Sequence, residues 1–101
     1  MQYHVTKVAE RELDRIFVYW AQRAGVEVAD RLIDAIEGRF AILGDYPYVG
    51  RKCDDLAPGV YRFPSGDYLI YYRKKRGAVQ TLHVFHGARD QARAFAQDER
   101  Q

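Results

Sequence analysis

The chain has 101 residues, of which 48% are hydrophobic and 30% charged, so it can form one domain with a buried core and is too short for two. No apolar run approaches the roughly 18 residues of a membrane helix, and residues 1–10 do not resemble a signal peptide. The single cysteine, Cys53, excludes an internal disulfide and suits a reducing compartment. We therefore expect a soluble cytoplasmic protein, with one domain over residues 1–101 and no metal or cofactor.

The first half of the sequence predicts a short strand and two helices. Residues 3–5 are short enough for a strand, and Thr6 is placed to cap the helix that follows. Apolar side chains recur at helical spacing over 8–24 and again over 28–43, with Gly25 between the two stretches. Both apolar stripes need a surface to cover, so we expect a helical hairpin packed on a sheet.

The second half predicts that sheet. Three stretches are rich in β-branched and aromatic residues and are separated by turn residues: 60–64, 68–73 and 79–86. Residues 50–59 follow neither period and are expected to form a loop on the sheet rim. The order β-α-α-β-β-β predicts an α+β fold, with the helical hairpin on one face of a three- to four-stranded antiparallel sheet. Two helices cannot cover every aromatic ring of that sheet, so part of the aromatic surface should be open to a partner.

The basic residues are concentrated in the middle of the chain. The net charge is +2, and residues 45–86 hold seven basic and four acidic side chains. Most of this excess is the run Arg73-Lys74-Lys75-Arg76. The run is compatible with a solvated hairpin tip that blunts a sheet edge, or with a contact for an acidic partner or a phosphate backbone.

Four segments, in this order, resemble the RelE/ParE toxin superfamily and most closely its ParE branch. They are YPYVGR at 46–51 with DDL at 54–56, PGVYRFP at 58–64, GDYLIYYR at 66–73, and LHVFHGARD at 82–90. With the two predicted helices, the resemblance covers nearly the whole chain. It implies the toxin half of a type II toxin–antitoxin module with the β-α-α-β-β-β fold.

The resemblance also implies partners. A ParD-like antitoxin, with a DNA-binding N-terminal part and a flexible C-terminal segment that wraps the toxin, would neutralise the protein in a hetero-oligomer, which we expect to be a heterotetramer. Operator DNA would be contacted only through the antitoxin, and no membrane is involved. The ParE branch implies inhibition of DNA gyrase without chemistry by the toxin. The alternatives are a RelE-like ribosome-dependent mRNA endoribonuclease, and a domain that has lost toxicity and only binds its antitoxin.

A ribonuclease would need an acid or base and cations around the phosphate. The candidates are His86, Arg62, Arg73 and Arg89. His83 lies three residues before His86 and should point to the opposite face of its strand. RelE-like nucleases tend to display several basic residues on the concave face of the sheet. The comparable strand positions here are expected to be aromatic, since they hold Tyr61, Phe63, Tyr68 and Tyr71. This pattern favours inhibition over catalysis, so we assign no catalytic residue and predict that the protein is not an enzyme.

Contacts with partners can be assigned to two groups of residues. The candidate anchors for the antitoxin are aromatic: Tyr19, Tyr61, Tyr68 and Tyr71. The candidates for contact with the target or an acidic partner are cations: Arg73, Lys74, Lys75, Arg76 and Arg89. Many ParE-like sequences carry arginine near the position of Tyr61, whereas here Arg62 is one step further on. Either the strand is bulged there or this protein uses different contacts.

Overall fold

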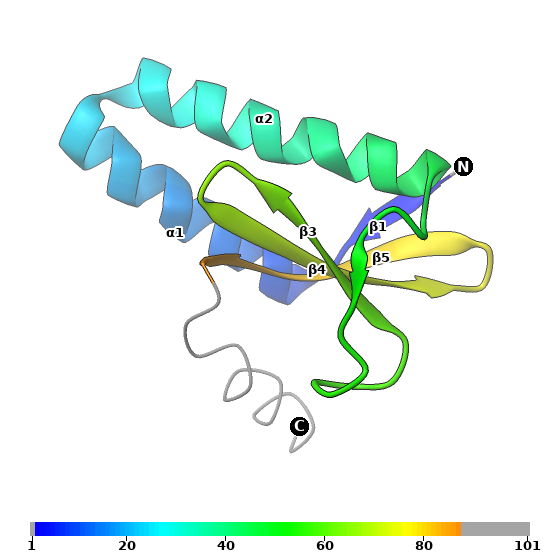
Figure 1. The fold of residues 1–101 in the computed structure, drawn as a ribbon. Coiled ribbons are helices and arrows are strands. Elements are labelled where there is room, and N and C mark those ends of the chain that lie inside the picture. The colour runs from blue at the N-terminus through cyan, green and yellow to red at the C-terminus, as the bar shows by residue number, and fades with distance from the viewer. Residues whose placement is uncertain (1, 88–101) are drawn as a thin grey trace.

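The helical half begins where the sequence predicts it. In the computed structural model, which describes residues 2–87, strand β1 (Tyr3–Val5) leads into helix α1 (Lys7–Ala24) (Figure 1). The Thr6 hydroxyl caps α1 by accepting a hydrogen bond from the backbone N–H of Ala9 at 3.2 Å. Gly25, with φ of 96°, separates α1 from α2 (Val26–Asp45), in a backbone conformation that glycine adopts far more readily than other residues.

Within the described part of the chain, the sheet has five strands and is mixed. After α2 come β2 (Arg51–Lys52), β3 (Val60–Ser65), β4 (Tyr68–Lys75) and β5 (Ala78–His86). Their order across the sheet is β1-β5-β4-β3-β2, with β1 parallel to β5 and the other neighbours antiparallel. The predicted α+β class and antiparallel meander are confirmed. The structure adds β2, inside the stretch expected as a loop, and the parallel pairing of β1.

Both helices pack on the same face of the sheet (Figure 1). The main core joins one stripe of each helix to alternate strand residues, and its fully buried members include Ile36, Phe40, Leu43, Ile70 and Tyr72. Because side chains alternate along a strand, Tyr61, Phe63 and Tyr68 also point toward the helices. This face therefore takes up most of the aromatic residues of the sheet.

The second face of the sheet has a smaller apolar cluster. Cys53, Val60 and Tyr71 are buried there, with Leu56 of the β2–β3 connection and Phe85 packed around them. The β3–β4 register is unbroken, so Tyr61 faces the helices and Arg62 faces the other way. Among the strand pairs of the described residues, the only register shift lies between β4 and β5, where Tyr71 pairs with His83 and Tyr72 pairs with Thr81. Of the two explanations left open for Arg62, a bulge in its own strand is thus excluded.

Candidate partner-binding groove

A groove of about 510 Å³ lies between α1 and the sheet, at the ends where β4 begins and β5 finishes. Its walls are apolar and aromatic: Ile16, Tyr19 and Trp20 come from α1, and Tyr68, Val84 and Phe85 come from the strands. Polar side chains stand around these walls, namely Glu12, Arg15 and His86. Such a site suits an amphipathic segment, since it offers apolar area with a few polar groups that fix orientation.

Aromatic contacts hold the groove in shape. The indole Nε1–H of Trp20 donates a hydrogen bond of 2.8 Å to the hydroxyl of Tyr68, which ties α1 to β4. The Tyr68 ring meets the His86 ring edge-on at 5.2 Å between centroids. Tyr19 packs edge-on against Trp20 at 5.3 Å, and the guanidinium of Arg23 lies 3.6 Å from the Tyr19 ring centroid. The groove walls are therefore braced before any partner binds.

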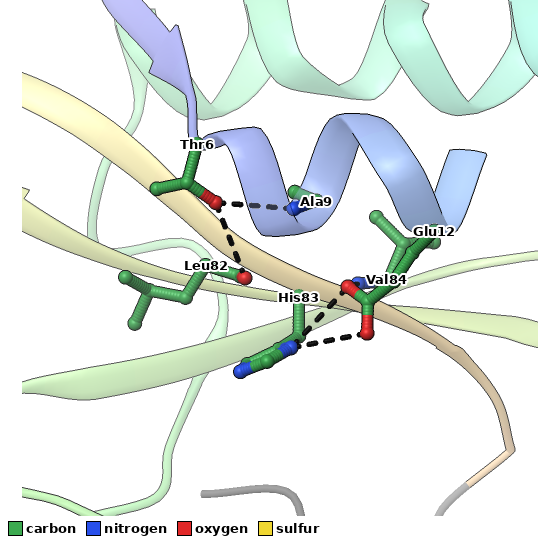
Figure 2. A network of polar contacts seen from close by, with 6 residues as sticks. All are labelled: Thr6, Ala9, Glu12, Leu82, His83 and Val84. Atoms are coloured by element: carbon green, nitrogen blue, oxygen red, sulfur yellow. Dashed lines mark hydrogen bonds and ion pairs between the residues drawn. The ribbon is translucent and has the colours of Figure 1, made fainter. Parts of the chain in front are cut away.

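Glu12 closes the edge of β5 beside this groove (Figure 2). Strand β1 covers β5 only as far as Thr81, because the chain then turns into α1. Beyond that point the Glu12 carboxylate accepts a hydrogen bond of 3.0 Å from the Val84 backbone N–H and lies 3.1 Å from the His83 Nδ1. The Thr6 hydroxyl donates to the Leu82 carbonyl at 3.4 Å. Beyond the end of β1, the side chains of Thr6 and Glu12 thus supply hydrogen bonds to the backbone of β5 in place of a neighbouring strand.

The predicted antitoxin anchors do not lie together. Tyr19, which is 46% exposed, and Tyr68, which is 6% exposed, line the groove. Tyr61 is half-buried in a separate stack with Tyr72, at 5.6 Å between ring centroids. Tyr71 is fully buried on the second face of the sheet, so the expectation that its ring is open to a partner is wrong. Its side chain packs under the β2–β3 connection, an interaction that the sequence pattern does not reveal.

The ribonuclease candidates are not assembled into one site. His86 points toward the helices and lines the groove, whereas Arg62 and Arg73 lie on the opposite face of the sheet. Arg89 lies outside the described residues. Opposite faces were predicted for His83 and His86, and the structure places them so. The expectation that one sheet face carries Tyr61, Phe63, Tyr68 and Tyr71 is wrong, because Tyr68 and Tyr71 are three residues apart in one strand and must face opposite ways.

The basic run divides into two pairs. Arg73 donates from Nε to the Gln80 side-chain oxygen at 3.0 Å, and Lys74 lies near the Tyr48 ring and 3.4 Å from its hydroxyl. Lys75 and Arg76 are exposed at the turn between β4 and β5. Two of the four cations are therefore engaged within the chain, and two are directed to solvent.

Three buried groups have displaced pKa values. Burial raises the pKa of Tyr72, against the lowering effect of the hydrogen bond that its hydroxyl accepts from the Gly50 N–H at 2.9 Å. Burial also raises the pKa of Tyr71, although nearby Arg62 opposes this shift. The Cys53 thiol has a raised pKa because it is buried, so it is a poor nucleophile at neutral pH. Within residues 2–87, no group of three His, Cys, Asp or Glu side chains is placed to hold a metal ion.

Sequence reasoning missed several residues of the groove. The groove also contains Trp20, Glu12, Arg15 and Phe85, none of which the sequence marks as a partner contact. Trp20 belongs to the apolar stripe of α1, and this stripe is the one feature of the sequence that points to its place in the groove. Nothing in the sequence marks Glu12, whose partners are 71 and 72 residues away. Neither helix in the described part of the chain is long and apolar enough to span a membrane.

Comparison with known proteins agrees with the fold and the predicted family. The family model described as ParE toxin of type II toxin-antitoxin system, parDE, matches residues 3–91. Toxin ParE3 of Caulobacter vibrioides is 32% identical over 82 residues, which cover 81% of this chain and 82% of that relative. Toxin ParE1 of Mycobacterium tuberculosis is 25% identical over 90 residues, which cover 88% and 92%.

A solved structure supports the architecture. It is described as the chromosomal ParDE TA system from P. aeruginosa and contains a chain that superposes with a TM-score of 0.76. The match has 22% sequence identity and covers 86% of this chain and 96% of that one, so it bears on the fold. The resemblance seen in the sequence is confirmed by the family match and by the identity to curated relatives. The chain therefore belongs to the ParE toxin family of type II toxin–antitoxin systems.

Proposed function

We propose that this ParE toxin acts by binding proteins and not by catalysis. In this proposal the groove between α1 and the sheet takes a segment of a ParD-like antitoxin, and the free toxin inhibits DNA gyrase. The observation that carries it is the groove itself, where two neighbouring aromatic side chains of α1, Tyr19 and Trp20, border an apolar hollow. Aromatic anchors in such hollows dominate the affinity of many protein interfaces.

The chemistry of the groove favours a flexible, amphipathic occupant. A segment that folds on binding must bury apolar area to offset the entropy it loses, and the groove presents this area. Arg15, Glu12 and His86 around the walls can pair with polar groups on the solvent side of such a segment. The similar solved structure, whose description names a ParDE system, is consistent with a ParD-type partner. We propose a heterotetramer for the complex, in which operator DNA is contacted by the antitoxin alone.

The antitoxin contact can be tested with Trp20, which is the single tryptophan of the chain. Titration with the cognate antitoxin should change the Trp20 fluorescence, because the ring lines the groove. Replacing Tyr19 by alanine should weaken binding by about thirtyfold, the effect of losing a hot-spot side chain. Tyr46→Ala serves as the control, since Tyr46 is 67% exposed and lies outside the groove. Equal losses in both variants would place the contact elsewhere.

The gyrase proposal is supported by family membership and by the separation of the catalytic candidates. Purified toxin should inhibit supercoiling by DNA gyrase, and added antitoxin should restore the activity. Cleavage of ribosome-bound mRNA that is lost in His86→Ala, with gyrase unaffected, would overturn the proposal in favour of a ribonuclease. Expression of the folded toxin alone without any growth defect would instead indicate a domain that only binds its antitoxin.

A further inference from the structure

A second hollow, of about 380 Å³, lies at the other end of β5 from the groove, where the β4–β5 turn meets β1. Its polar side chains are amides and basic groups, contributed by Gln2, His4, Lys75, Arg76 and Gln80, and no carboxylate from residues 2–87 lines it. It shares no residue with the groove between α1 and the sheet. The hollow is therefore a separate surface with a bias toward anions.

The two cations of this hollow have no partner within the described residues. Lys75 and Arg76 make no side-chain hydrogen bond or ion pair there, in contrast to Arg73 and Lys74. The Gln80 side-chain oxygen already accepts a bond from Arg73, so its amide NH₂ remains to donate to a ligand. Cations and an amide donor together suit a carboxylate.

Arg76 occupies a backbone position that disfavours arginine. The β4–β5 turn has two residues between the paired Lys75 and Ala78, and both have positive φ, 52° at Arg76 and 78° at Gly77. Asparagine, aspartate and glycine are the residues that favour the first position of such a turn. Backbone strain of this kind often accompanies function. The conformational preference of arginine therefore does not account for its presence at this turn.

An open sheet edge adjoins the hollow. Among the described residues β1 is an outer strand of the sheet, and Tyr3 is 41% exposed. The Val79 N–H donates to the Gln2 carbonyl and the Thr6 N–H donates to the Thr81 carbonyl, both at 3.1 Å. The backbone N–H and C=O groups of residues 2, 4 and 6 thus point toward β5. Those of the intervening Tyr3 and Val5 point away from β5, to the edge of the sheet. Such an edge can pair with an added extended chain.

We propose that the β1 edge and the β4–β5 turn together bind an extended, acidic segment of a protein partner. The segment pairs its main chain with Tyr3 and Val5, and a carboxylate side chain enters the hollow to contact Lys75, Arg76 and the Gln80 amide. His4 lies on the same face of the sheet as Gln80, its register partner, and borders the same hollow. Because the groove lies at the other end of β5, both surfaces can be occupied at once.

The proposal is tested with the full chain and a synthetic peptide in which glutamate alternates with threonine. In an NMR titration, amide signals of Tyr3, Val5 and the β4–β5 turn should shift, while the Trp20 indole signal stays in place. Arg76→Asn should weaken binding about tenfold, the effect of losing one charge-assisted contact. It should also raise the melting temperature, because asparagine tolerates the left-handed backbone.

Matched controls separate this site from general attraction to a basic protein. Lys52→Gln removes one positive charge from β2, at the far edge of the sheet, and should leave peptide binding unchanged. A peptide with glutamine in place of glutamate should bind weakly. The inference is overturned if both variants lose affinity equally, if the glutamine peptide binds as well, or if duplex DNA binds these residues more tightly than the acidic peptide.

Discussion

Glu12 shows how one side chain can complete a sheet. Its carboxylate accepts the Val84 N–H where β1 no longer covers β5, and it also lies against the nearly buried His83 ring. An unsatisfied N–H at this half-buried edge would lose a hydrogen bond to water without gaining another. Glu12 also borders the groove, so the residue that closes the sheet edge helps to shape the proposed antitoxin site.

Glu12→Ala should lower the free energy of unfolding by about 1–3 kcal/mol, because the Val84 N–H and the His83 ring both lose their acceptor. Urea denaturation measures the difference. Asp14→Ala is the control, since Asp14 is an exposed acidic residue in the same helix. A loss no larger than that of the control would mean that water replaces the carboxylate at the edge of β5.

At the scale of an element, the segment between α2 and β2 is fixed by close contact with the sheet. The N–H of Gly50 donates to the Tyr72 hydroxyl, and a Cβ added at Gly50 would lie 2.6 Å from the Arg62 backbone oxygen. Gly50 is therefore required for this close approach, which its place in a stretch expected as a loop does not reveal. The contact lies one residue before β2, which is the outer strand at this end of the strand order.

Gly50→Ala should destabilise the protein by about 1–3 kcal/mol, since the methyl group meets backbone and a buried ring that cannot move freely. Gly38→Ala is the matched control, because a Cβ at this helical position meets nothing within 4 Å and alanine favours a helix. The control should raise the melting temperature, and Gly50→Ala should lower it. Two changes of the same sign would contradict the explanation.

At the scale of the whole molecule, a buried tyrosine on each face of the sheet makes the stability of the fold depend on pH. Tyr72 lies in the core under the helices, and Tyr71 lies under the β2–β3 connection. Burial raises both pKa values above those of the unfolded chain. The folded state thus holds these protons more tightly, so their contribution to stability is complete below about pH 10 and is lost as the pH rises further.

The free energy of unfolding should fall as the pH rises above about 10, and Tyr72→Phe should reduce that slope because it removes one titrating group. Urea titrations between neutral and alkaline pH give the slopes. Tyr46→Phe, which changes an exposed ring, is the control. An unchanged slope in Tyr72→Phe would show that other groups cause the alkaline transition.

The sequence by itself determined the elements and the family. Helical spacing in 8–24 and 28–43, the Thr6 cap and the break at Gly25 are local features, so they predicted α1 and α2 nearly to their ends. Alternation and turn residues predicted β3, β4 and β5 for the same reason. The two residues of β2 are too few to show a period, and the parallel pairing of β1 joins segments more than 70 residues apart, so neither was foreseen.

Only the tertiary structure decided which side chains meet. Alternation places Tyr68 and Tyr71 on opposite faces, but which face lies under the helices depends on packing between distant segments. The same packing brings Trp20 to Tyr68, Glu12 to Val84, and His4 to Arg76, and it separates His86 from Arg62. Surfaces for partners form from such long-range contacts, whose energies no local window of the sequence contains.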